Sequence, residues 1–194
     1  MIKKTTAVLI ATLLSVPTAF AATYAVDTAH TQIHFTIPHL MVFKVRGNFN
    51  DFSGTVEVDP DKQTLTSAQA TIQTVSIDTR NEKRDGHLRS ADFFAVDQHP
   101  EITFVTQKIS GSADDITVVG DLTIKGISKE ITLKGAFLGA ATDPWGNKRA
   151  GFEATGQIDR RDFGLTYNKA LETGGVLVGD IVEIGLEVEA VAQQ

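Results

Sequence analysis

Alternation of apolar and polar residues with a period of two runs through most of this sequence and constrains its fold more than any other feature. The closing segment, DIVEIGLEVEAV, shows it most clearly. Apolar residues occupy every second position from Val182 to Ala190, and Glu183, Glu187 and Glu189 lie between them. Successive side chains of a strand point to opposite faces, so this pattern predicts a strand with one buried face and one solvated face.

Seven further segments alternate in the same way, which gives eight predicted strands, and a YAVD piece (24–27) extends the first of them. The seven are TQIHFTI (31–37), TVEVD (55–59), AQATI (68–72), EITFVTQKI (101–109), VVGDLTIKG (118–126), KEITLKGAF (129–137) and GFEATGQID (151–159). The predicted class is therefore all-β and antiparallel. Closure into a barrel removes the sheet edges, and an eight-stranded barrel is wide enough to be filled by side chains or to hold one small ligand. The pattern alone leaves a two-sheet sandwich as the alternative.

The interval 80–96 lacks this alternation and has the composition of a helix. Asn81 or Thr79 would cap a short helix through Leu88, and Ser90 would cap a second helix with Asp92 in its first turn. We therefore expect a short helical excursion around 80–96. Two smaller irregularities, at 49–52 and 74–75, are the places where we expect β-bulges.

The first residues indicate export. Lys3 and Lys4 precede an apolar run, 7–16, which is followed by Pro17 and the small-residue pattern Ala19-Phe20-Ala21. This pattern predicts a secretory signal peptide, residues 1–21, cleaved after Ala21, and a periplasmic location. The run is about ten residues long, whereas a membrane-spanning helix needs about 20, so no stable membrane insertion is expected. A single domain, 22–194, remains.

The composition narrows the possible partners. The chain has no cysteine, so that disulfides and thiolate metal sites are excluded. Its net charge is −6, and loss of the two signal lysines would make it −8. This acidic balance argues against nucleic acid as a partner and against electrostatic docking on anionic lipid, since both require a basic surface.

We do not expect the closely spaced histidines His30 and His34 to form a metal site. His30 and His34 would share one helical turn, but four residues of a strand span about 13 Å, too far for one ion with ligands at about 2.0–2.1 Å. We predict no metal and no cofactor. His39, in an apolar loop, would either bind a ligand head group or hydrogen-bond a backbone carbonyl.

The stretch RDGHLRSADFF (84–94) has two further interpretations. Ser90 lies near His87 and Asp92, but a triad is assembled in space, and a serine at a helix start is more often a cap, so no catalytic residue is assigned. Arg84, His87 and Arg89 would form an anion site with helix N-terminal amides. Alternatively, Arg84 and Asp85 pair with neighbouring groups and fix this excursion against the barrel, while Phe93 and Phe94 fill its apolar end.

Several motifs together resemble those of the YceI-like family of periplasmic polyisoprenoid-binding proteins, over essentially the whole mature chain. They are AHTQIHFTIPHL, VRGNFNDFSG, VSIDTRNEKRDGHLRSADFF, HPEITF, GDLTIKGISKEITL, GQIDRRDFGL and GDIVEIGLEVEA. The resemblance implies an eight-stranded antiparallel lipocalin-like barrel that holds a long isoprenoid lipid, such as a prenyl phosphate or an isoprenoid quinone. No reaction is established for the family, so we expect no enzyme. The G-x-W signature of true lipocalins is absent, and Trp145 lies in a predicted turn.

The resemblance and the alternation together give the candidate binding residues. Those expected to line the cavity are Ile33, Phe35, Ile37, Phe49, Phe52, Phe94, Phe104, Leu122, Phe152 and Phe163. Those expected at its mouth, near the head group, are His39, Arg84, His87 and Arg161. The expected role is lipid carriage or sequestration, with a homodimer possible.

Two alternatives stay open. One is a lipid-phosphate-processing enzyme that uses His87 with Arg84 and Asp85. The other is a non-catalytic module that supports a membrane-bound redox partner.

Overall fold

The structure is a computed structural model that describes residues 21–59, 62, 64–170 and 174–193. The predicted signal peptide lies outside these residues except for Ala21. The described elements are β1 (Ala22–Val26), β2 (Gln32–His39), β3 (Phe43–Phe49), β4 (Phe52–Asp59), β5 (Thr64–Gln73), η1 (Thr74–Ser76), β6 (Ile77–Asp78), α1 (Glu82–Arg89), β7 (Glu101–Ser112), β8 (Asp115–Ile124), β9 (Ile127–Thr142), β10 (Lys148–Asp159), η2 (Arg160–Phe163) and β11 (Ile181–Ala192).

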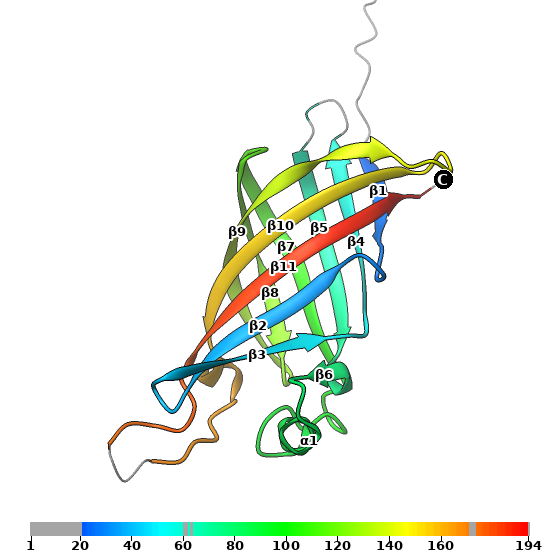
Figure 1. The fold of residues 1–194 in the computed structure, drawn as a ribbon. Coiled ribbons are helices and arrows are strands. Elements are labelled where there is room, and N and C mark those ends of the chain that lie inside the picture. Colours follow the sequence, from blue (N-terminus) through cyan, green and yellow to red (C-terminus); the bar gives the residue numbers. More distant parts are fainter. Residues whose placement is uncertain (1–20, 60–61, 63, 171–173, 194) are drawn as a thin grey trace, which may run out of the picture.

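These strands close into an eight-stranded antiparallel barrel, which confirms the predicted fold class (Figure 1). The ring follows the order β1-β4-β5-β7-β8-β9-β10-β11 and closes where β1 also pairs with β11. Strand β11 pairs with β1 through residues 190–192 and with β2 through residues 183–187. β1 and β2 thus form one side of the barrel in succession, as expected from the YAVD extension.

Strand β3 is an element that the sequence analysis did not predict. It pairs with β2 along its whole length and with the two residues of β6. Left-handed φ angles at Leu40 (52°) and Met41 (63°) turn the chain back into it. The expected bulge at 49–52 is instead the corner where β3 ends and β4 begins, and the one at 74–75 is the 3-10 helix η1. Both bulge predictions were therefore wrong.

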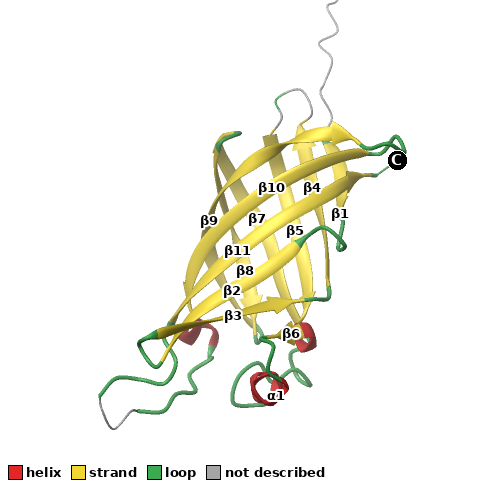
Figure 2. Cartoon of the chain, in the orientation of Figure 1, coloured by secondary structure: helices red, strands yellow, loops and turns green. Residues whose placement is uncertain are grey.

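The helical excursion is present as one helix, α1, which lies at the lower end of the barrel in Figure 2. The Asn81 side chain caps it by accepting a hydrogen bond of 3.0 Å from the backbone N–H of Arg84. The predicted second helix is absent from the described residues, since 91–94 form turns. Ser90 is the C-cap of α1 instead, and its hydroxyl donates to the carbonyl of His87 at 2.7 Å.

Buried side chains gather in two clusters, one at each end of the barrel interior. The upper cluster includes Tyr24, Phe137 and Phe152, and the rings of the two phenylalanines lie 5.2 Å apart. The lower cluster includes Ile77 and Phe163, next to α1 and η2. No helix of the described residues is both long and apolar enough to cross a membrane.

Candidate functional site

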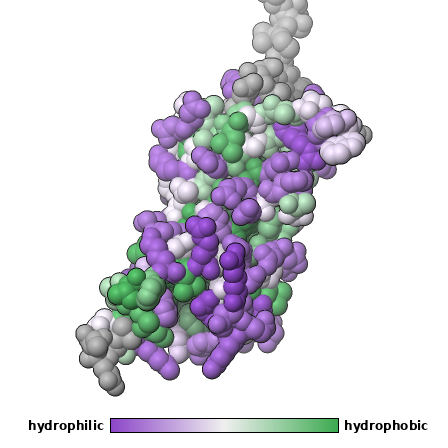
Figure 3. All heavy atoms as spheres, viewed as in Figure 1, coloured by the Kyte–Doolittle hydropathy of each residue, from purple (hydrophilic) through white to green (hydrophobic). Residues whose placement is uncertain are grey.

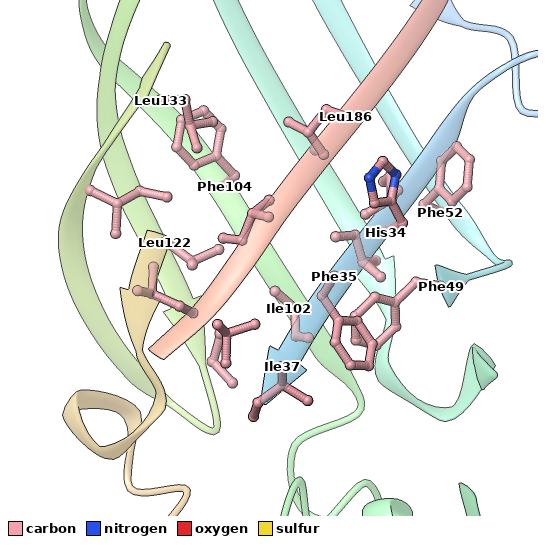
Figure 4. Close-up of a pocket in the computed structure, with 18 of the residues that line it drawn as sticks. His34, Phe35, Ile37, Phe49, Phe52, Ile102, Phe104, Leu122, Leu133 and Leu186 are labelled. Atoms are coloured by element: carbon pink, nitrogen blue, oxygen red, sulfur yellow. The ribbon is translucent and has the colours of Figure 1, made fainter. Parts of the chain in front are cut away.

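A cavity of about 650 Å³ runs along the barrel axis and is lined mostly by apolar side chains (Figure 4). Its walls come from every strand of the ring, and its lower end reaches Lys83 on α1. Lys83 and its neighbour Asn81, which also borders the cavity, are both exposed. Nine of the predicted lining residues border it: Ile33, Phe35, Ile37, Phe49, Phe52, Phe94, Phe104, Leu122 and Phe152.

Strand alternation positions this lining. Ile33, Phe35 and Ile37 on β2 all face the cavity and are only partly buried, because their inner surfaces border its space. On β7, the ring of Phe104 lies next to Gly120 of the neighbouring strand β8. A Cβ built on Gly120 would lie 2.5 Å from Cζ of Phe104. The absence of a side chain at Gly120 therefore leaves room for the ring against the wall.

Phe163 does not line the cavity, and this part of the prediction was wrong. It is 1% exposed and packs in the lower cluster. The chain leaves β10 at Asp159 and turns into η2, so the alternation of the strand no longer decides where Phe163 points.

Arg161, predicted at the mouth, does not border the cavity either. Its guanidinium pairs with Asp159 at 2.5 Å and with Asp180 at 3.2 Å, on the outer surface. The Asp159 carboxylate raises the pKa of Arg161 above its ordinary value. Its neighbour Arg160 points inward instead and does border the cavity.

Arg160 ties the segment after η2 across the lower end of the barrel. Its Nε donates to the carbonyl of Gly179 at 2.8 Å, and one terminal nitrogen donates to the carbonyls of Leu165 and Tyr167, the latter at 3.0 Å. The other terminal nitrogen donates to Asp180 at 3.2 Å. Burial lowers the pKa of Arg160. Every nitrogen of this side chain thus bonds to the protein itself.

Arg84 borders the cavity, but its polar atoms hold the chain that enters α1. Its Nε donates to the Thr79 hydroxyl at 2.7 Å, and a terminal nitrogen donates to the Thr79 carbonyl at 2.6 Å. The buried Asp85 carboxylate accepts from the Thr79 N–H at 3.0 Å and from its hydroxyl. These bonds match the structural interpretation of RDGHLRSADFF more closely than the anion-site interpretation.

Arg89 has the same structural role. It donates to the carbonyls of Val75 and Ile77, both at 2.9 Å, and so joins the end of α1 to η1 and β6.

His87 borders the cavity from α1. Its Nε2 lies 2.9 Å from an oxygen of Asp92, and its ring meets those of Phe93 and Tyr167 edge to face, with centroids 5.0 and 4.8 Å away. The Ser90 hydroxyl bonds to the backbone carbonyl of His87 and not to its ring. These residues therefore lack the serine-to-imidazole hydrogen bond of a hydrolytic triad.

Comparison with known proteins shows the family to which this chain belongs. The family model for the YceI-like domain matches residues 24–190. This chain belongs to the YceI-like family. A UPF0312 protein of Staphylococcus aureus (strain MSSA476) is 45% identical over 167 residues, which cover 86% of this chain and 95% of that protein.

Solved structures of similar proteins agree with the fold. The YCEI protein of Campylobacter jejuni has a TM-score of 0.71 at 33% identity, covering 81% of this chain and 91% of that one. BcnA of Burkholderia cenocepacia has a TM-score of 0.73 at 26% identity, covering 85% and 99%. A polyisoprenoid binding domain from Saccharophagus degradans shares the fold, with a TM-score of 0.63 at 16% identity over 90% and 100%.

Sequence reasoning missed part of the lining of this YceI-like barrel. The inward positions of the closing strand were visible in its alternation, but phenylalanines were favoured over aliphatic residues. Tyr167, Leu177 and Val178 follow η2 without regular alternation, and no sequence signal marked them. The missed lining residues include Ile131, Leu133, Ala154, Arg160, Leu165, Tyr167, Leu177, Val178, Val182, Ile184, Leu186 and Val188. His39, which was predicted, does border the cavity and forms a β-bridge with Val178.

A second group of charged residues in this YceI-like chain joins the turn between β1 and β2 to β10 and β11. Asp27, His30 and Glu189 bring ligand atoms within 4.8 Å of one another. The Arg149 guanidinium stands among them, donating to Asp27 at 2.7 Å and to Glu189. Its Nε also donates to Asp143 at 2.9 Å. The Arg149 and His30 hydrogen bonds lower the pKa of Asp27 to about 2. Arg149 thus supplies the positive charge that this acidic group requires.

Proposed function

We propose that this protein is a periplasmic carrier that takes up one long polyisoprenoid lipid, as a prenyl phosphate or an isoprenoid quinone, with its tail in the barrel cavity. The observation that carries the proposal is the apolar cavity of about 650 Å³ that runs through the barrel as far as α1. Small-molecule pockets have volumes of about 300–1,000 Å³ and are mostly apolar. The periplasmic location is proposed from the signal-like N-terminal sequence. The domain from Saccharophagus degradans that shares the fold is described as a polyisoprenoid binding domain, which is the same ligand class.

The tail would supply most of the binding free energy. Each buried CH₂ contributes about 0.8 kcal/mol, so a tail of tens of carbons gains more than enough for tight binding. Immobilising a flexible tail consumes much of that gain. The ligand is therefore recognised by the shape and apolar surface of the cavity, and tails of similar girth should compete with one another.

The head group would lie at the lower end, near His39, His87 and Lys83. Arg84 and Arg160 border the same region, but their nitrogens bond to Thr79, to backbone carbonyls and to Asp180. Because these two arginines already bond within the protein, they are poorly placed to bind a head group. We therefore expect the head group to contribute little to recognition. Burial of the tail without a reaction is accordingly the proposed activity.

Mass spectrometry of lipid extracted from the natively purified protein tests this proposal. We expect an isoprenoid near one equivalent per chain, and uptake of a polyprenol by delipidated protein. Finding neither would sink the proposal. The enzyme alternative predicts that the protein releases phosphate from a prenyl phosphate, and that the His87→Ala variant does not. Phosphate release that depends on His87 would mean that the protein is an enzyme and not mainly a lipid carrier.

A further inference from the structure

The connection between β2 and β3 exposes four apolar residues in a row. Leu40, Met41, Val42 and Phe43, here called the apolar tip, have exposed fractions of 38, 67, 73 and 68%. Soluble surfaces seldom present contiguous large apolar side chains without a binding role. The backbone of the tip is held in place, since the Leu40 N–H donates to the carbonyl of Leu177 at 2.9 Å.

The apolar tip is continuous with the lower end of the cavity. Pro38 and His39, just before it, border the cavity, as do Leu177 and Val178 beside it. Figure 3 shows hydrophobic side chains gathered at this end, over the β2–β3 connection and the segment that precedes β11. An apolar surface outside the protein thus joins the apolar surface inside it.

The segment that carries the apolar tip differs in charge from the whole chain. The chain has a net charge of −6, yet no aspartate or glutamate occurs from Thr28 to Asn50. Lys44 and Arg46 follow the tip directly, and both are exposed. Lys44 pairs with Glu183 at 2.8 Å. The tip can therefore approach lipid phosphates without carboxylates of its own segment facing them.

We propose that the apolar tip inserts into the surface of a phospholipid bilayer and holds the cavity mouth against it. This inference rests on the proposed function, because a polyisoprenoid resides in a bilayer and would then pass into the barrel without crossing water. The apolar side chains, rather than the net charge, drive the contact, as in interfacial anchors. Four side chains form a reversible contact, far smaller than a membrane span of about 20 residues.

Flotation with vesicles of phosphatidylethanolamine and phosphatidylglycerol, free of isoprenoid, tests the contact in the mature protein. We expect the double variant Val42→Ser with Phe43→Ser to lower vesicle partitioning about tenfold or more, since both lost side chains are apolar and exposed. The matched control is Leu138→Ser with Trp145→Ser, which removes two apolar residues, 63 and 81% exposed, outside the apolar tip. Partitioning of this control should equal that of the unaltered protein.

Fluorescence gives a second readout, because Trp145 is the single tryptophan of the chain. Val42→Trp in a Trp145→Phe background should shift its emission to the blue on addition of vesicles, whereas Trp145 in the unaltered protein should not. Equal partitioning of the tip variant and the unaltered protein would overturn the inference. So would a dimer in light scattering that the tip substitutions dissociate, with no vesicle binding, because a second copy would then cover the tip.

The lipid-carrier function and the bilayer contact of the apolar tip can be tested independently. Uptake of a polyprenol from detergent by the tip variant tests the cavity without any bilayer. Normal uptake combined with lost partitioning supports both proposals. Normal partitioning of the unaltered protein with no uptake under any condition would reject the lipid-carrier function and leave only a bilayer contact.

Discussion

The ring of Phe35 lies across Gly47, its register partner on β3, so that a Cβ on Gly47 would fall 2.4 Å from Cζ of Phe35. It would also fall 2.8 Å from Cγ2 of Thr79. We therefore expect Gly47→Ala to lower the free energy of unfolding by about 1–3 kcal/mol, as overpacked cores do. Urea titration followed by circular dichroism measures this change.

The control for that substitution is Gly86→Ala on α1, where nothing lies within 4 Å of the added Cβ. Alanine is the better helix former, so this variant should be neutral or more stable by about 0.5–1 kcal/mol. Equal stability of Gly47→Ala and the unaltered protein would show that the ring moves aside without cost.

Ala154→Phe should block the cavity, because Ala154 borders it from the middle of β10. We expect lipid uptake to weaken about tenfold or more, which is about 1.4 kcal/mol of binding free energy. Thr155→Phe places the same ring at the adjacent exposed position and should bind normally. Titration with a fluorescent polyprenol analogue compares the two variants. Equal affinities would mean that the tail does not pass Ala154.

Arg160→Met should destabilise the fold far more than Arg161→Met. Arg160 is buried, and its loss leaves the carbonyls of Leu165, Tyr167 and Gly179 without their donor. The expected cost is about 3–5 kcal/mol, typical of breaking a buried charged network. Arg161 is exposed, so the urea unfolding midpoint of the Arg161→Met variant should be close to that of the unaltered protein. Similar midpoints for the two variants would contradict the assigned role of Arg160.

Arg149→Gln should reduce the acid sensitivity of the fold. The hydrogen bond from Arg149 is the largest of the contacts that lower the pKa of Asp27 from 3.8 to about 2, and the hydrogen bond with His30 comes next. A carboxyl with a lowered pKa stabilises the fold above its unfolded pKa, and that stability is lost as the pH falls through the folded pKa. The variant should thus be less stable than the unaltered protein at pH 6, with a difference that shrinks between about pH 4 and pH 2.

Thermal melts from pH 6 to pH 2 measure that effect. Lys134→Gln, which removes a lysine that donates to the Thr117 hydroxyl, serves as the control of equal charge change. Its difference from the unaltered protein should stay nearly constant over the same range. A constant difference for Arg149→Gln would mean that its carboxylate contacts do not control the acid response.

The barrel could be predicted because each ring strand has one face toward an apolar interior and one toward water. Apolar and polar residues therefore alternate along the sequence of each strand. Strand β3 could not be predicted in this way. Its outward Lys44 and Arg46 fit a strand, but Gly47 interrupts the apolar face at the point where Phe35 takes its place. The predicted loop of apolar residues before it is the turn at Leu40 and Met41.

The site was less predictable than the barrel because irregular segments build its lower end. The sequence Asp159-Arg160-Arg161-Asp162 offers two arginines with similar neighbours, and only the turn of η2 decides that Arg160 points inward. For the same reason Phe163 packs beside the cavity and not along it. The Asn81 cap, by contrast, depends on a local hydrogen bond and was predictable from sequence.

The contact between the Phe104 ring and Gly120 has an evolutionary consequence. The Phe104 ring and the backbone carbonyl of Val105 both occupy the space that a Cβ at Gly120 would fill, so a side chain there requires a smaller residue at position 104 and a local shift of the backbone. Relatives with a bulkier residue at the position of Gly120 should carry a smaller one at the position of Phe104. Such coupled exchanges would let descendants of one barrel accommodate lipids of different girth while the strand order stays the same.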